Sequence, residues 1–108
     1  MPLRVRVCRL ADVVPGELRA FDVSGVTWPV IVTYLDGAMI AFPGVCPHED
    51  VSLADYGVLD EDRQVVCRVH GYRFDLATGK CEHVPSLHLH LRRYKITMTG
   101  DEVWVDLL

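Results

Sequence analysis

Two short stretches of this chain each place one cysteine close to one histidine. The first is Cys46-x-His48, and the second is Cys67-x-x-His70. Together they offer two thiolates and two imidazoles, which make a complete set of four ligands for a metal centre. Zinc fingers usually pair two cysteines in one motif and two histidines in another, whereas each motif here is mixed.

Two kinds of metal centre accept such a set. In a [2Fe–2S] cluster in which two histidines replace two cysteines, one iron takes both thiolates and the other takes both imidazoles. A structural zinc ion accepts the same four ligands as a tetrahedron. An iron site would be coloured and would become paramagnetic on reduction, whereas a zinc site would be neither.

Size and composition describe the chain around this centre. It has 108 residues, of which 50% are hydrophobic, so we expect one domain over residues 1–108 with its own core. The formal net charge of −4 argues against a nucleic-acid partner, which would need a basic surface. Charged residues interrupt the N-terminus, and no apolar run approaches the ~20 residues that span a bilayer, so we expect a cytoplasmic protein without membrane contact.

The elements that must position the ligands read as short strands. We expect strands at residues 3–8, 18–23, 28–35, 38–42, 94–98 and 103–107, with a small hairpin formed by residues 58–59 and 64–66. Asp36-Gly37 is a strong hairpin signal, and the strand after it leads directly to Cys46. No segment sustains a 3.6-residue period. The pattern predicts an all-β class, with antiparallel sheets arranged as a barrel or sandwich.

Further residues extend the second motif into a longer signature. His70 is followed by Gly71-x-x-Phe74-Asp75-x-x-Thr78-Gly79. With Cys46-x-His48, this pattern resembles the signature of Rieske iron–sulfur proteins and is not a zinc-finger pattern. The resemblance covers essentially the whole chain. It is strongest to the ferredoxin components of bacterial aromatic-ring dioxygenases and toluene monooxygenases.

The resemblance implies a cofactor and its ligands. One Rieske-type [2Fe–2S] cluster would be present, with Cys46 and Cys67 on a buried iron. His48 and His70 would hold the outer iron, which takes the electron. The resemblance also implies a Rieske-type fold in which a small cluster-binding subdomain, at about residues 44–82, carries both ligand loops.

The resemblance further implies a function without catalysis. The chain would be a soluble, monomeric one-electron carrier in aromatic hydrocarbon catabolism, and not itself an enzyme. It would take electrons from a flavin-containing NAD(P)H ferredoxin reductase and pass them to a terminal oxygenase hydroxylase. Three alternatives stay open: a fixed electron-transfer subunit of an oxidoreductase complex, a redox sensor, and a small zinc-binding β interaction module.

The chain departs from the respiratory Rieske proteins in two respects. Those proteins carry an extra cysteine in each loop, joined as a disulfide, and neither loop here has one. They also place a serine and a tyrosine, whose hydroxyls bond sulfur, where this chain has Tyr72 and Phe74. Fewer hydrogen bonds to sulfur stabilise the reduced cluster less, so we expect a potential of roughly −150 mV in a range that reaches about +300 mV.

Charged residues and a glycine near the ligands allow two interpretations each. The acids between His48 and Cys67 are either solvated loop residues or a negative collar that steers a basic partner; they are Glu49, Asp50, Asp55, Asp60, Glu61 and Asp62. Gly71 is either an ordinary turn glycine or one that brings backbone N–H groups to the cluster sulfides.

We expect no chemical role for most of the remaining cysteines and histidines. We expect Cys8 and Cys81 to be reduced thiols that serve packing, because neither has a ligand-like neighbour. His88 and His90 share a strand face and are expected to face solvent. Their alternative, two ligands of a mononuclear iron, needs a substrate pocket that the chain leaves little room for. His83 is assigned no role.

Overall fold

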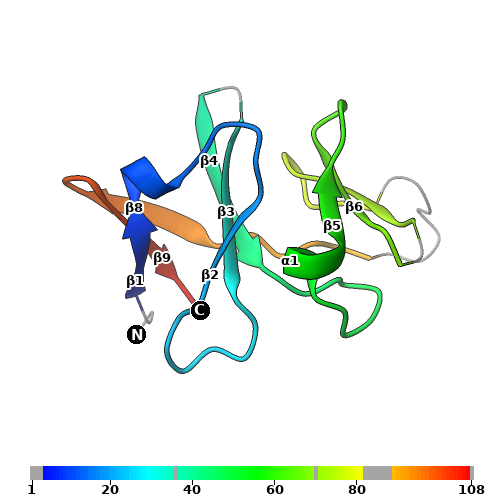
Figure 1. The fold of residues 1–108 in the computed structure, drawn as a ribbon, viewed down its shortest axis with the longest axis horizontal. Helices are drawn as coiled ribbons and strands as arrows, with labels where there is room; N and C mark the ends of the chain where they lie inside the picture. Colours follow the sequence, from blue (N-terminus) through cyan, green and yellow to red (C-terminus); the bar gives the residue numbers. More distant parts are fainter. Residues whose placement is uncertain (1–3, 36, 70, 82–88, 108) are drawn as a thin grey trace.

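The computed structural model describes residues 4–35, 37–69, 71–81 and 89–107 of the chain. These residues form three antiparallel sheets of three strands each, together with two short helical segments. Figure 1 shows one sheet in the middle of the molecule and one towards each end. The all-β class and the antiparallel pairing expected from the sequence are confirmed.

The first sheet lies at the end of the molecule that carries both chain termini (Figure 1). Its strand order is β1, β9, β8, with bounds Arg4–Arg9, Glu102–Asp106 and Lys95–Thr99. Val103 and Val105 of β9 are fully buried. The register of β1 shifts between Arg6 and Cys8, and this irregularity pairs Cys8 with Val103 in the core. A 3₁₀ turn, η1 (Leu10–Asp12), follows β1.

The middle sheet is covered on both faces. Its strands are β2, β3 and β4, with bounds Arg19–Phe21, Val30–Leu35 and Ala38–Pro43. The first four residues of β3 are all buried, as expected for a strand between two packed layers. Val30 and Val32 belong to the core shared with the first sheet, whereas Ile31 belongs to the core that reaches the third sheet. The β3–β4 hairpin predicted from the sequence is confirmed.

The third sheet carries one ligand loop and packs beside the other. Its strands are β5, β6 and β7, with bounds Gly57–Leu59, Gln64–Cys67 and Arg73–Asp75. A one-turn helix, α1 (Leu53–Tyr56), precedes β5. The sequence predicted the β5–β6 hairpin but neither α1 nor β7, because three or four residues are too few to show a period.

The ends of α1 are fixed by local chemistry. Ser52 Oγ accepts a hydrogen bond from the Asp55 N–H at 3.3 Å, as an N-cap does. Gly57 has extended backbone angles, which end the helix, and its N–H donates to the Leu53 carbonyl. A Cβ at that position would lie 2.5 Å from the same oxygen, so the close approach requires glycine. The helix therefore passes directly into β5 without a loop.

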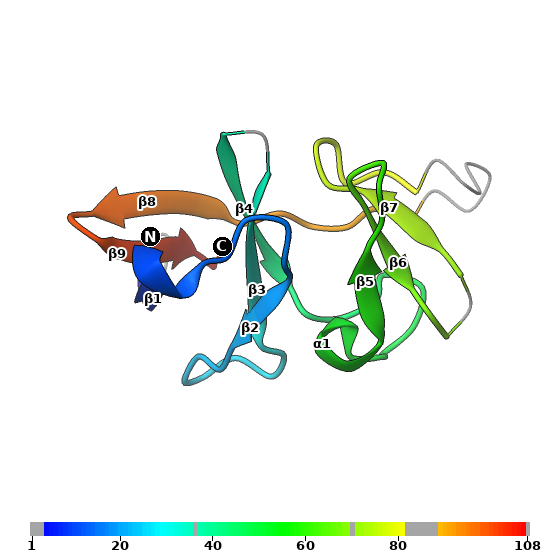
Figure 2. The ribbon, with the colours of Figure 1, turned by 45° about the horizontal axis from the view of Figure 1, so that its top comes forward.

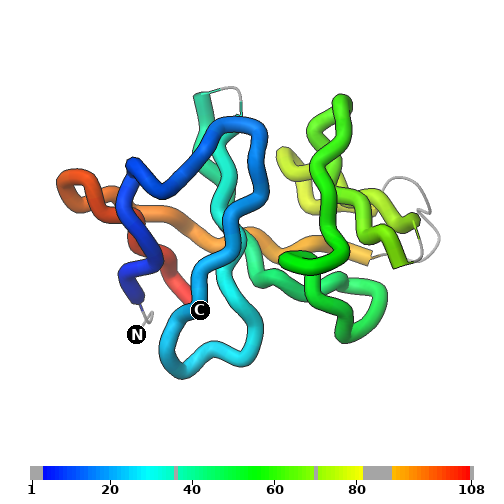
Figure 3. The backbone as a smooth tube through the Cα atoms, viewed as in Figure 1, coloured from blue at the N-terminus to red at the C-terminus, as the bar shows by residue number. Residues whose placement is uncertain are grey.

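A C-terminal arm, residues 89–94, leads the chain back from the third sheet to the first, as the orange tube in Figure 3 shows. Leu91 of this arm is fully buried, and its N–H donates to the Gly79 carbonyl at 2.6 Å. Tyr94 donates to the Ala41 carbonyl at 2.8 Å, which ties the arm to β4. Within the described part of the chain, no helix is long and apolar enough to cross a bilayer.

Candidate metal centre

The first ligand loop follows β4 and is closed by backbone hydrogen bonds. Val45 pairs with Ser52 across it, and the Cys46 N–H donates to the Val51 carbonyl at 2.9 Å. At its base the Gly44 N–H donates to the Pro29 carbonyl at 2.7 Å. A Cβ on Gly44 would stand 2.9 Å from that same oxygen, so the close approach requires glycine. The loop is therefore anchored to the middle sheet.

The second ligand loop connects β6 to β7. The Cys67 N–H donates to the Tyr72 carbonyl, and the Gly71 N–H donates to the Cys67 carbonyl, at 2.9 and 2.8 Å. Gly71 has a φ of +76°, which favours glycine. Its N–H is thus used to close the turn, which supports the reading of Gly71 as a turn glycine. His70, the fourth predicted ligand, lies outside the described residues.

The fold brings the two thiols together. Cys46 is 3% exposed and Cys67 is fully buried, and the Cys67 side chain lies within hydrogen-bonding reach of Cys46. Burial raises the pKa of the Cys46 thiol, and Cys67 raises it further, whereas backbone N–H groups of His48 and Glu49 lower it. Such N–H donors stabilise negative charge on sulfur. In Figure 2 the chain that follows β4 lies beside α1 at the lower edge of the third sheet.

His48 lies at the edge of this buried pair. Its Nδ1 atom is buried, and its ring packs on Tyr72 with centroids 4.2 Å apart and planes tilted by 55°. Phe74 is fully buried in the hydrophobic core that also contains Cys46 and Cys67. Among the described residues, which leave out His70, no three Cys, His, Asp or Glu side chains form a group able to hold one metal ion. The four-ligand set therefore stays a prediction.

The Asp75-x-x-Thr78-Gly79 part of the signature builds a turn. The Asp75 carboxylate accepts the N–H groups of Ala77 and Thr78 at 2.7 and 3.2 Å. The Gly79 N–H donates to the Asp75 carbonyl at 2.6 Å. Gly79 has a φ of +81°, and an added Cβ would collide with the Leu91 carbonyl oxygen. This half of the signature therefore packs closely against the C-terminal arm at Leu91.

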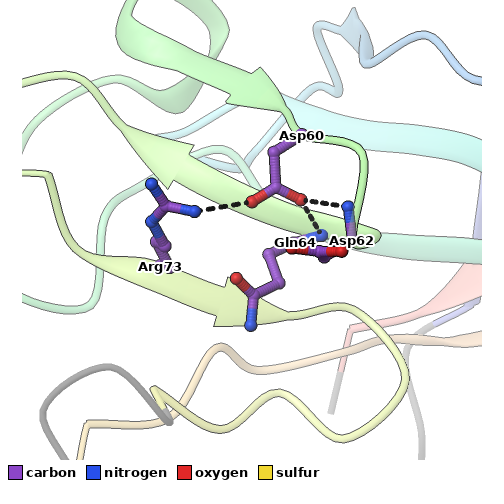
Figure 4. A network of polar contacts seen from close by, with 4 residues as sticks. All are labelled: Asp60, Asp62, Gln64 and Arg73. Carbon is purple, nitrogen blue, oxygen red and sulfur yellow. Dashed lines mark hydrogen bonds and ion pairs between the residues drawn. The ribbon is translucent and has the colours of Figure 1, made fainter.

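The acidic residues between His48 and Cys67, for which solvated loop charges and a negative collar were both left open, fall into two groups. Figure 4 shows Asp60 accepting the N–H groups of Asp62 and Gln64, each at 2.9 Å, and pairing with Arg73 at 3.2 Å. Asp60 is thus a turn residue. Because Gly57 pairs with Cys67, the turn that contains Asp60, Glu61 and Asp62 is at the opposite end of the β5–β6 hairpin from Cys67. A continuous collar of all six acids is therefore wrong.

The remaining acids lie on the elements nearest the ligands. Glu49 and Asp50 are exposed in the first loop, and Asp55 is exposed on α1. Arg68, between the ligand positions of the second loop, bonds to backbone carbonyls of α1, a contact that sequence reasoning missed. The Ser52-x-x-Asp55 pattern, typical of a helix start, was the signal that would have placed α1 there.

The described residues include some, but not all, of the other cysteines and histidines. Cys8 and Cys81 are buried and free of disulfides, as expected for structural thiols. Cys81 shares the core of Cys46 and Cys67. His90 is exposed, as predicted. His83 and His88 lie outside the described residues.

Comparison with known proteins agrees with the resemblance found in the sequence. Residues 4–95 match the Rieske [2Fe-2S] domain. The chain is 32% identical over 102 residues to the ferredoxin component of biphenyl 2,3-dioxygenase from Rhodococcus jostii (strain RHA1), covering 94% of this chain and 91% of that one.

Two solved structures share the fold. One is the ferredoxin of carbazole 1,9a-dioxygenase from Nocardioides aromaticivorans IC177, with a TM-score of 0.76 and 34% identity over 95% of this chain and 96% of that one. The other is a ferredoxin in a complex of reduced oxygenase and oxidized ferredoxin in carbazole 1,9a-dioxygenase. Its TM-score is 0.77 at 28% identity, over 95% of this chain and 92% of that one.

Proposed function

The chain belongs to the Rieske [2Fe–2S] family, and from this premise we propose that it is the electron carrier of a multicomponent oxygenase. It passes one electron at a time to a terminal oxygenase, and the oxygenase transforms the substrate. The observation that carries the proposal is the meeting of two buried thiols from two separate loops, within a chain whose relatives are ferredoxin components.

One Rieske-type [2Fe–2S] cluster is the cofactor of this family, and when bound it takes up and returns a single electron. We propose Cys46 and Cys67 as ligands of one iron, and His48 and His70 as ligands of the other. The donor chemistry fits: the two sulfurs are adjacent and buried, and backbone N–H groups point at Cys46. Tyr72 packs on the His48 ring and limits its rotation.

A terminal oxygenase is the proposed acceptor. The carbazole 1,9a-dioxygenase ferredoxin is similar to this chain and forms a complex with its oxygenase. Val69, 41% exposed between the ligand positions of the second loop, offers an apolar contact for such a partner. A flavin-containing NAD(P)H reductase is the proposed donor. A shuttle must release both partners, so small and transient interfaces are expected.

We further propose that residues 1–108 act as one domain. The core around Cys46 and Cys67 also contains Ile31 and Phe42 of the middle sheet, and Leu91 of the C-terminal arm. The ligand-carrying part, about residues 44–82, therefore depends on the rest of the chain for its core. Under anaerobic denaturation, tryptophan fluorescence from Trp28 and Trp104 and the visible absorbance of the cluster should change together. Loss of absorbance well before fluorescence would contradict this.

Anaerobic reductive titration tests the proposed function. We expect a coloured protein that takes up one electron per chain and becomes paramagnetic. Its potential should fall at the low end of the Rieske range, roughly −150 mV, because Phe74 offers no hydroxyl and no disulfide joins the loops. A colourless chain that binds zinc would contradict the function, and a potential above zero would contradict the argument about sulfur hydrogen bonds.

A further inference from the structure

Arg68 is a charged residue placed between the ligand positions of the second loop. Its backbone N–H donates to the Tyr56 carbonyl at 2.8 Å. Its guanidinium donates from Nη2 to the Asp55 carbonyl at 2.7 Å, and from Nε to the Tyr56 carbonyl at 3.4 Å. These three bonds all end on backbone oxygens of α1, so Arg68 is bound to main chain that cannot rotate away.

The carbonyls that Arg68 reaches are ones that α1 itself does not satisfy. The last carbonyl groups of a helix have no partner within the helix. Gly57 supplies its N–H to the Leu53 carbonyl, and Arg68 supplies donors to the two carbonyls at the C-terminal end, those of Asp55 and Tyr56. The planar guanidinium presents several N–H groups in a fixed fork, which suits two neighbouring oxygens better than an ammonium does.

The other end of α1 is bonded to the first ligand loop. The Leu53 N–H donates to the Gly44 carbonyl at 2.9 Å, and Ser52 pairs with Val45. Ser52 also caps the helix, and its carbonyl accepts the Tyr56 N–H at 3.0 Å. An unbroken path of hydrogen bonds and one helical turn therefore runs from Arg68 to the residue preceding Cys46.

We propose that Arg68 is a positioning residue that fixes the two ligand loops relative to one another through α1. The inference rests on the proposed function in that it takes Cys46 and Cys67 as cluster ligands. Its consequence is that the side-chain bonds of Arg68 add to the pairing of β5 with β6 and to the shared core in holding the two loops together.

The test compares the holoprotein with the variants R68A, R68K and R73A. Arg73 is the matched control, because it is an exposed arginine of the same sheet, but it pairs with the Asp60 side chain at the far end of the hairpin. Cluster loss into a chelator is followed by visible absorbance under anaerobic conditions, and the paramagnetic resonance of each reduced protein is recorded.

We expect R68A to lose its cluster about tenfold faster than the wild-type chain, since the charge-assisted hydrogen bonds from the second loop to α1 are gone. Its resonance should broaden as ligand geometry becomes heterogeneous. R68K, which keeps one charged donor, should restore both properties in part, and R73A should stay within about twofold of wild type.

The outcomes distinguish a failure of this inference from a failure of the proposed function. Equal rates and spectra for R68A and R73A, with a coloured wild-type chain, would overturn the role of Arg68. A wild-type chain without a cluster would overturn the proposed function instead. R68A could fail to assemble a cluster while R73A assembles one. In that case, partial cluster assembly by R68K would support the proposal. Cluster assembly and retention by R68K equal to those of the wild-type chain would overturn the need for the guanidinium fork.

Discussion

Neighbouring groups shift the pKa of the Cys46 thiol in opposite directions. Burial and the adjacent Cys67 raise the pKa of the Cys46 thiol, while backbone N–H groups of His48 and Glu49 lower it. Without metal, the balance favours the neutral thiol. Metal binding to this site must therefore release protons, and its affinity should rise with pH.

Cys8 shows how a buried cysteine differs from a ligand. Burial, followed by the nearby Asp12, raises the pKa of the Cys8 thiol from 9.0 to about 11. At pH 8 its thiolate fraction falls about a hundredfold below that of an ordinary cysteine, so we expect very slow alkylation in the folded protein. Mass spectrometry after a timed iodoacetamide pulse measures this, with the urea-unfolded chain as control.

The same shift gives a stability prediction. Because the folded pKa of Cys8 lies above the unfolded value, the folded state holds the proton more tightly. Its contribution is complete below about pH 9 and is lost as the pH rises towards 11. The stability difference between the wild-type chain and C8A, from urea midpoints, should therefore shrink across this window. A difference that grows would contradict the assignment.

At the scale of elements, tight turns hold the ligand loops in place. The turn after β7 fits against the C-terminal arm only because Gly79 has no side chain. Its positive φ disfavours any other residue, and the Leu91 carbonyl oxygen occupies the space that a Cβ would need. The arm and the third sheet thus share one backbone contact that tolerates no added atom.

We expect G79A to destabilise the protein by about 3 kcal/mol, because it combines left-handed strain with a backbone collision. The control is G25A, which has a similar φ of +84° but no atom of the described residues within 4 Å of the added Cβ. That variant should cost only about 1 kcal/mol. Equal losses for the two variants in urea unfolding would show that the Leu91 contact is unimportant.

The sequence predicted those elements that local chemistry determines. The Asp36-Gly37 turn placed the β3–β4 hairpin, and alternation placed β9 within one residue of its observed bounds, Glu102–Asp106. Helix α1 and the bonds from Arg68 to it could not be predicted in this way, because they depend on which segments the fold brings together. The ion pair of Asp60 could not be predicted for the same reason, since its partner Arg73 is thirteen residues away.

At the scale of the whole molecule, charge near the ligand loops bears on partner choice. Glu49 and Asp50 are exposed in the first loop, whereas Glu61 and Asp62 are exposed at the far end of the β5–β6 hairpin. If the acceptor presents a basic face, only the first pair lies where it can steer the encounter.

We expect E49Q/D50N to slow association with the oxygenase several-fold at low salt, and E61Q/D62N, which removes the same charge, to have little effect. Stopped-flow electron transfer from the reduced chain, over a series of salt concentrations, measures both. A wild-type rate that does not fall with added salt would contradict steering by either pair.

The central claim is a cluster held by two cysteines and two histidines. Pulsed electron paramagnetic resonance of the reduced protein, with its five histidines labelled with ¹⁵N, tests this claim most directly. We predict strong coupling of the unpaired electron to two histidine nitrogens, from His48 and His70. A reduced cluster without histidine coupling would contradict the account, because its irons would then be bound by other ligands.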